Sequence, residues 1–154
     1  MSQVEDRLRA AGLRVPDVAV PLADYVPAVR DGDLVWTSGQ LPTAEGVLLA
    51  TGTVGADVSA ETAAELARTC ALNALAAVRG VVGDLDAVRR VVKVTGFVAS
   101  APGFTAQPAV VNGASSLLAT AFGDAGRHAR SAVGVAVLPL GAPVEVELVV
   151  SLAP

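Results

Sequence analysis

Three polar side chains stand directly before a long apolar run in the last third of the chain: Arg127, His128 and Arg130. An arginine guanidinium can hold a carboxylate through two parallel hydrogen bonds, so Arg130, at the mouth of the run, is a candidate anion clamp. The three residues could instead form a catalytic cluster, or only a solvated loop. A metal site is not expected, because His128 is the only histidine and no cysteine lies near it.

Glu145 and Glu147 lie two residues apart in a second apolar stretch. In a strand this spacing places both carboxylates on one face. Such a pair can act as acid and base when its surroundings shift the two pKa values apart, or it can meet basic residues of a neighbouring chain. If the last two strands are adjacent and antiparallel, Glu145 could lie close to Arg130, which would indicate a site more strongly than either residue alone.

The segment TSGQLP, Thr37 to Pro42, follows an expected strand. Ser38 could offer a hydroxyl, and Gly39 a closely approachable amide, to a ligand, although an ordinary strand-end turn has the same composition. A Ser-His-Asp system is conceivable, but no GxSxG elbow supports it. The fingerprints of dinucleotide and nucleoside-triphosphate sites, GxGxxG and GxxxxGK[ST], are absent from the sequence.

The elements that must position these groups follow from hydrophobic periodicity and capping residues. In chain order we expect a helix over 4–11, a hairpin around Arg30 to Asp33, a loop over 41–55, a helix from Ser59 to about Val82, a strand over 91–100, a helix over about 105–122, and strands over 131–138 and 144–152. This order predicts one α+β domain over residues 1–154, with an N-terminal helical extension over 1–20. Two long helices would cover one face of a mixed sheet.

The composition excludes some classes of protein. Of the 154 residues, 53 % are apolar but only 17 % are charged and 3 % aromatic, and such an apolar surplus predicts an oligomer. The net charge of −4, without a basic patch, argues against nucleic acid or an anionic membrane as a partner. Cys70 is expected to be a buried small hydrophobe in a reduced, cytoplasmic protein. Prolines and glycines interrupt the uncharged stretch from Val94 to Gly123, so no transmembrane helix is expected.

Several segments together resemble the RidA/YjgF family of small proteins over nearly the whole chain. They are Tyr25, TSGQLP, NALAAV, VVKVTGFVAS, FTAQPAVVNGA and ARSAVGVAVLPLGAPVEVE. The last is the most specific, because an Arg-Ser pair, a Leu-Pro turn and a Val-Glu-Val-Glu strand follow one another. The resemblance implies a chorismate-mutase-like fold and a barrel-shaped homotrimer with sites in clefts between subunits. The N-terminal helix and the Arg127 to Arg130 run are typical of a longer branch.

The resemblance also implies roles for individual residues. Arg130 would grip a substrate carboxylate, and Glu145 would position the attacking water. The residues implied to line the same cleft are Tyr25, Ser38, Gly39, Asn112 and Ala132. At Ala132 the family usually has a cysteine, so only the backbone carbonyl could serve there. His128 and Arg127 have no counterpart in the family pattern, and we expect His128 to be a loop residue.

The activity implied by the resemblance is hydrolysis of reactive enamines and imines, such as 2-aminoacrylate and 2-iminopropanoate, to a keto acid and ammonia, without cofactor or metal. A second hypothesis is a regulatory trimer that binds a small carboxylate without turnover. Ribonuclease activity, a label often given to the family, is disfavoured by the acidic balance and the single histidine. Ammonia release distinguishes the first hypothesis from the second.

Overall fold

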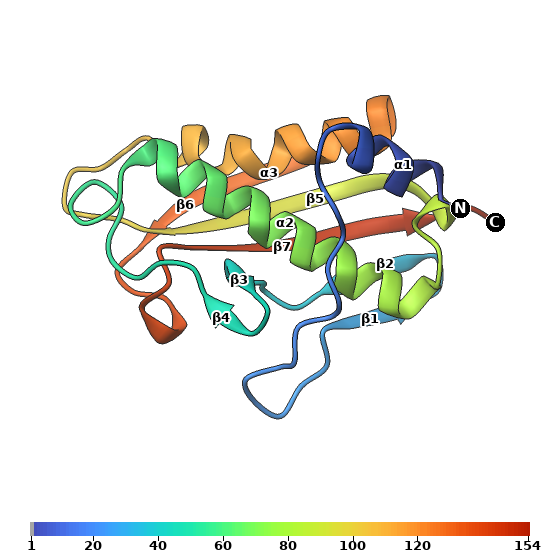
Figure 1. Ribbon diagram of the computed structural model, residues 1–154, viewed down its shortest axis with the longest axis horizontal. Helices are drawn as coiled ribbons and strands as arrows, with labels where there is room; N and C mark the ends of the chain where they lie inside the picture. The colour runs from blue at the N-terminus through green and yellow to red at the C-terminus, as the bar shows by residue number, and fades with distance from the viewer. Residues whose placement is uncertain (1) are drawn as a thin grey trace.

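The computed structural model describes residues 2–154 as one α+β domain built on a five-stranded mixed sheet (Figure 1). The strands lie in the order β1-β2-β7-β5-β6, and only the β5–β6 pair is parallel. Their bounds are Ala28–Asp31 for β1, Leu34–Thr37 for β2, Val88–Ala99 for β5, Ala129–Val135 for β6 and Val144–Leu152 for β7. A small hairpin, β3 (Thr43–Ala44) with β4 (Val47–Leu48), lies within the segment expected to be a loop.

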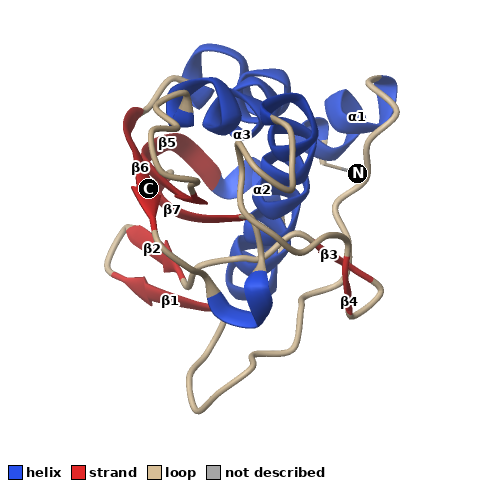
Figure 2. Ribbon diagram, turned by 90° about the vertical axis from the view of Figure 1, so that its left-hand side faces the viewer, coloured by secondary structure: helices blue, strands red, loops and turns tan. Residues whose placement is uncertain are grey.

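Two long helices, α2 (Ala60–Val82) and α3 (Gln107–Phe122), cover one face of the sheet (Figure 2). The hydroxyl of Ser59 caps α2 by accepting from the amide of Thr62, and Pro108 occupies the first turn of α3, as expected. Small residues let the helices approach each other: a Cβ on Gly113 of α3 would collide with the backbone of Ala64 in α2. The alternate residues of β7 from Val144 to Leu152 complete the core between helices and sheet.

The opposite face of the sheet is not covered by any part of residues 2–154 (Figure 2). Glu145 and Glu147 lie on this open face, as the alternation of β7 predicts. Apolar side chains lie beside them: Val29, Trp36 and Val133 are 53 %, 52 % and 44 % exposed. The face is therefore mixed, with acids among exposed apolar groups.

The strand order excludes one arrangement that the sequence left open. β6 and β7 are not neighbours, because β5 lies between them and pairs with both. The unit β5–α3–β6 is a strand, a crossover helix and a parallel strand, and such units place the second strand beside the first. The strand expected over 131–138 also begins two residues earlier and ends at Val135, and the strand expected over 91–100 begins at Val88.

The N-terminal helix α1 (Gln3–Ala10) is bound firmly to the domain. The carboxylate of Asp86 accepts from the hydroxyl of Ser2 at 2.8 Å and from the amides of Gln3 and Val4 at 2.8 and 3.0 Å, so it caps the helix from a distant part of the chain. Arg79 of α2 donates to Glu5 at 2.5 Å and to the Pro16 carbonyl at 2.7 Å. In residues 2–154 no helix is long and apolar enough to span a membrane.

Candidate functional site

Arg130 lies on the edge strand β6, and its side chain extends over α3 rather than into solvent. Nη1 donates to Asn112 Oδ1 at 2.8 Å and to Ser115 Oγ at 3.2 Å, and Nη2 donates to the Pro108 carbonyl at 3.2 Å. These acceptors follow one another along a single face of α3, at helical spacings of four and three residues. The guanidinium is therefore held in one orientation by three acceptors, none of them charged.

The sequence of β6 makes room for this arrangement. Ala132 and Gly134 share the face of Arg130, and their small size allows α3 to lie close to the strand; a Cβ on Gly134 would come within 2.8 Å of the Gln107 side chain. Ala132 packs against the core. A guanidinium has five N–H donors, and Arg130 uses three of them on α3. Within residues 2–154, the Nε–H and one Nη2–H have no acceptor and could receive a carboxylate.

Glu145 is the second chemically informative residue. It lies half-buried on the open face of β7, and residues 2–154 supply neither a hydrogen bond nor a basic partner to its carboxylate. Burial raises the pKa of Glu145, and the negative charge of Glu147 raises it further. Perturbed carboxylates of this kind concentrate at functional sites, where a raised pKa makes the carboxylate a stronger base.

The turn after β2 lies against Glu145. A Cβ on Gly39 would lie only 2.7 Å from Cδ of Glu145, so only glycine leaves room for the carboxyl group there. Ser38 Oγ donates to the Val26 carbonyl at 2.7 Å, which ties this turn to the loop that carries Tyr25. Buried Asn73 of α2 donates to the Leu41 and Thr43 carbonyls at 2.9 and 3.0 Å and fixes the following segment.

A cavity of about 580 Å³ adjoins this turn. Tyr25 and Gly39 line it, and most of its wall is apolar and comes from residues 16–22 and the β3–β4 hairpin. The helix α1 packs beside the C-terminal ends of α2 and α3, as Figure 1 shows, and does not line the cavity. The N-terminal segment reaches the cavity through residues 16–22 only.

The implied site residues thus form two separate clusters in one chain. The first cluster, which we call the clamp cluster, holds Arg130, Asn112 and Ala132. The second, the acid cluster, holds Tyr25, Ser38, Gly39 and Glu145. In the sheet register, Arg130 of β6 pairs with Val94 of β5, whereas Glu145 of β7 pairs with Phe97 of β5. The two residues are therefore offset by three residues along β5 and lie on strands that β5 separates. With ladder spacings of about 4.8 Å and a rise of about 3.3 Å per residue, their Cα atoms are roughly 14 Å apart.

The two side chains also leave opposite faces of the sheet, Arg130 toward α3 and Glu145 toward the open face. The sequence left open that adjacent antiparallel strands bring Arg130 and Glu145 together within one chain, and the strand order excludes this arrangement.

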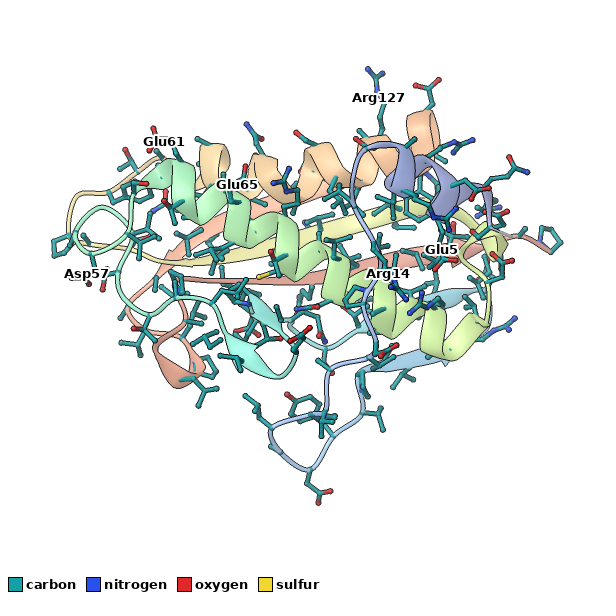
Figure 3. All side chains as sticks on the ribbon, in the orientation of Figure 1. Glu5, Arg14, Asp57, Glu61, Glu65 and Arg127 are labelled. Atoms are coloured by element: carbon teal, nitrogen blue, oxygen red, sulfur yellow. The ribbon has the colours of Figure 1, made fainter. Side chains whose placement is uncertain are left out.

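His128 and Ser115 are neighbours of the clamp cluster, and sequence reasoning missed both Ser115 and its contact with His128. His128 lies in the loop before β6, as expected, but its Nε2 is 2.9 Å from Ser115 Oγ. Ser115 is three residues after Asn112 on α3, and this helical spacing opposite an arginine is the signal that could have identified it. Arg127 differs from both, because its side chain extends away from the molecule into solvent (Figure 3).

Cys70 lies in the core beneath β7 and is fully buried. Burial raises the pKa of its thiol well above the usual value, and the charge of Glu145 adds to the effect. A protonated, inaccessible thiol is a poor nucleophile, so Cys70 acts as a core residue. In residues 2–154, no three His, Cys, Asp or Glu side chains are grouped so that they could hold a metal ion.

Comparison with known proteins agrees with this architecture. Residues 5–152 match the family described as "YjgF/chorismate_mutase-like, putative endoribonuclease". The chain is similar to Protein TCP17 of Trypanosoma cruzi, with 44 % identity over 97 % of this chain and 94 % of that protein.

Two solved structures share the fold over almost the full length. The protein Atu1372 of Agrobacterium tumefaciens, of unknown function, is 46 % identical with a TM-score of 0.91. The match covers 97 % of this chain and 93 % of the Atu1372 chain. A protein of Shewanella oneidensis MR-1, described as a "putative endoribonuclease", is 36 % identical with a TM-score of 0.94, over 97 % and 99 % of the two chains. The match over residues 5–152 shows that this chain belongs to the YjgF/chorismate-mutase-like family.

Proposed function

We propose that this protein hydrolyses small imino acids, with their enamine tautomers, to 2-keto acids and ammonia, in the cytoplasm and as a homotrimer. In the reaction, a water oxygen forms a bond to the imine carbon while the C=N π electrons move to nitrogen. The water gives one proton to a base, which later returns it to the nitrogen. The carbinolamine hydroxyl then gives up its proton, which passes to the amine nitrogen as the C–N bond breaks. Ammonia leaves, the C–O bond becomes a carbonyl, and water is the only co-reactant.

Arg130 supports a substrate that carries a carboxylate. Its guanidinium is held on α3 by three neutral acceptors, so its charge is not neutralised within the clamp cluster. The two remaining N–H groups can form charge-assisted hydrogen bonds to one carboxylate. A fixed guanidinium would also orient the imine carbon, which is a large part of the catalysis that an already electrophilic centre needs.

Glu145 is the single observation that favours turnover over binding alone. A binding site for an anionic ligand gains nothing from a half-buried carboxylate with no partner, because that group costs free energy and repels the ligand. A base that takes a proton from water and returns it to nitrogen works best with a raised pKa, as Glu145 has. The Gly39 amide, which has no acceptor in residues 2–154, could hold the carbinolamine oxygen.

The separation of the two clusters supports sites between subunits. Arg130 and Glu145 of one chain are too far apart, and on opposite sheet faces, to act on one small molecule. The clamp cluster lies on the free edge strand β6, which is suited to meet the open, partly apolar face of a second copy. We infer that Arg130 of one subunit and Glu145 of another complete each site.

The test is a coupled assay in which a serine dehydratase generates 2-iminopropanoate and its loss is followed together with ammonia release. The protein should accelerate the loss. Arg130→Ala should raise KM strongly, and Glu145→Gln should lower kcat by about 100-fold or more. Glu147→Gln, on the same face of the same strand, is the matched control and should keep most of the activity.

Two outcomes would overturn the proposal. Pyruvate binding that depends on Arg130, without any acceleration of imine loss, would establish a carboxylate-binding protein that lacks turnover. Cleavage of RNA that is lost in Glu145→Gln or Arg130→Ala would establish the endoribonuclease that the family description names, despite the net charge of −4.

A further inference from the structure

A continuous chain of hydrogen bonds runs from Arg130 to the backbone at Gly126. Arg130 Nη1 donates to Ser115 Oγ at 3.2 Å, Ser115 Oγ is 2.9 Å from Nε2 of His128, and Nδ1 of His128 is 2.6 Å from the Gly126 carbonyl oxygen. The four residues come from β6, from α3 and from the turn between them. The chain therefore joins the clamp cluster to the segment that leads into β6.

The chemistry of its two ends fixes two protons of this chain, and a neutral His128 ring places the third. The Gly126 carbonyl can only accept, so Nδ1 of His128 must carry a proton. The guanidinium can only donate, so Ser115 Oγ must accept from Arg130. A neutral imidazole with its proton on Nδ1 has a lone pair on Nε2, which takes the single proton of the Ser115 hydroxyl.

The protonated ring fits the same positions poorly. Nε2–H of an imidazolium would donate to Ser115, which would then accept from two cations, Arg130 and His128. The hydroxyl proton of Ser115 would have to find another acceptor. The neutral ring leaves no proton unused along the chain.

The turn that carries Gly126 is built for close contact with α3. Gly126 is buried, and a Cβ there would collide with the backbone of Leu118 and Ala119. Glycine at this position lets the turn lie against the helix, which brings its carbonyl within reach of the His128 ring. The Gly126 carbonyl, which ends the hydrogen-bond chain as its acceptor, is thus held in place like the Arg130 guanidinium at the donor end.

We propose that His128 and Ser115 are positioning residues for Arg130, which His128 reaches only through the Ser115 hydroxyl. By taking the hydroxyl proton, Nε2 of His128 turns the oxygen lone pairs of Ser115 toward the guanidinium. With Asn112, Ser115 then holds both N–H groups of Nη1 and leaves the Nε–H edge for a substrate carboxylate. This inference rests on the proposed role of Arg130 as the carboxylate clamp.

The first test needs no substrate. His128 is the only histidine, so the nitrogen resonances of ¹⁵N-histidine-labelled protein report this ring alone. In the neutral ring that the hydrogen bonds favour, the proton is on Nδ1 and Nε2 is unprotonated, and Ser115→Ala should perturb the Nε2 resonance more than Ser116→Ala, its exposed neighbour. A proton on Nε2 in the native protein would overturn the assignment.

The second test is kinetic. Ser115→Ala and His128→Leu should each raise KM for the imino acid by about fivefold, the size of one ordinary hydrogen bond in net terms, with kcat little changed. His128→Gln can accept from Ser115 and should restore KM. In the Ser115→Ala background, His128→Leu should have no further effect, because His128 acts through that hydroxyl.

The two failures can be told apart. If the protein shows no turnover, the same variants are compared by pyruvate titration, and a fivefold rise in Kd with the same non-additivity still supports the positioning role. Two results would overturn the positioning role. Either both variants lose folded protein while KM and Kd stay unchanged, or the effects of the two substitutions add. Each would show that His128 and Ser115 only stabilise the fold.

Discussion

Replacing Gly39 by alanine should move the carboxylate of Glu145 without disturbing the backbone. Gly39 has no left-handed φ, so alanine is tolerated conformationally. The new methyl carbon would lie 2.7 Å from Cδ of Glu145 and still closer to Oε1, whereas ordinary contacts begin near 3.4 Å, so the carboxyl group must withdraw by more than about 1 Å. A misplacement near 1 Å costs about 100-fold in rate, and we expect a loss of this order in kcat.

The assay is hydrolysis of 2-iminopropanoate, with pyruvate binding measured in parallel. Because Arg130 is untouched, Kd for pyruvate should change little, and the free energy of unfolding should shift by no more than about 1 kcal/mol. Gly80→Ala, in α2, is the matched control: its Cβ would lie 3.2 Å from Val18 Cγ2 and would contact no atom of Glu145, so kcat should stay at the native value. In the Glu145→Gln background, Gly39→Ala should cost nothing further. An unchanged kcat in the single variant would refute the role of Glu145.

The other predictions concern stability. Glu145→Gln should raise the melting temperature at pH 7: burial raises the pKa of Glu145, so the native protein loses stability as the pH rises through that pKa, whereas the variant does not. The difference should disappear in acid, and a variant less stable at both pH values would contradict the argument. Asp86→Ala should loosen α1 by about 1 kcal/mol, seen as faster amide exchange from Val4 to Leu8. Amide hydrogen bonds from Gln3 and Val4 lower the pKa of Asp86, so its contribution should persist above the usual aspartate pKa and vanish as the pH falls through the lowered one.

The elements that depend on local pattern could be predicted from the sequence. Ser59 and Pro108 mark the starts of α2 and α3, and the strict alternation of β7 places Glu145 and Glu147 on one face. These signals act over a few residues, so the folded state preserves them. The β3–β4 hairpin was missed because two strands of two residues carry too little periodicity to recognise.

The arrangement of the site depends on strand order, which local pattern does not contain. The alternation of the last two strands left open whether β6 lies beside β7, although the rule for parallel crossovers favours β6 beside β5, as observed. The same limit explains why the contact between His128 and Ser115 could not be predicted. The two residues are thirteen positions apart in the sequence and come together only when the Gly126 turn packs on α3. Arg130 and Glu145 were candidates from their residue types and spacing, and the resemblance implied their roles, but their separation into two clusters required the fold.

Complementation between two inactive variants tests most directly whether each site takes Arg130 from one subunit and Glu145 from another. Arg130→Ala and Glu145→Gln proteins are purified, dissociated, mixed in equal amounts and reassembled, and the formation of hybrids is verified with differently tagged chains. In random cyclic hybrids about a quarter of the sites would receive an intact Arg130 and an intact Glu145, so activity should return to about a quarter of the native value. Hybrids no more active than either parent would contradict a site shared between subunits.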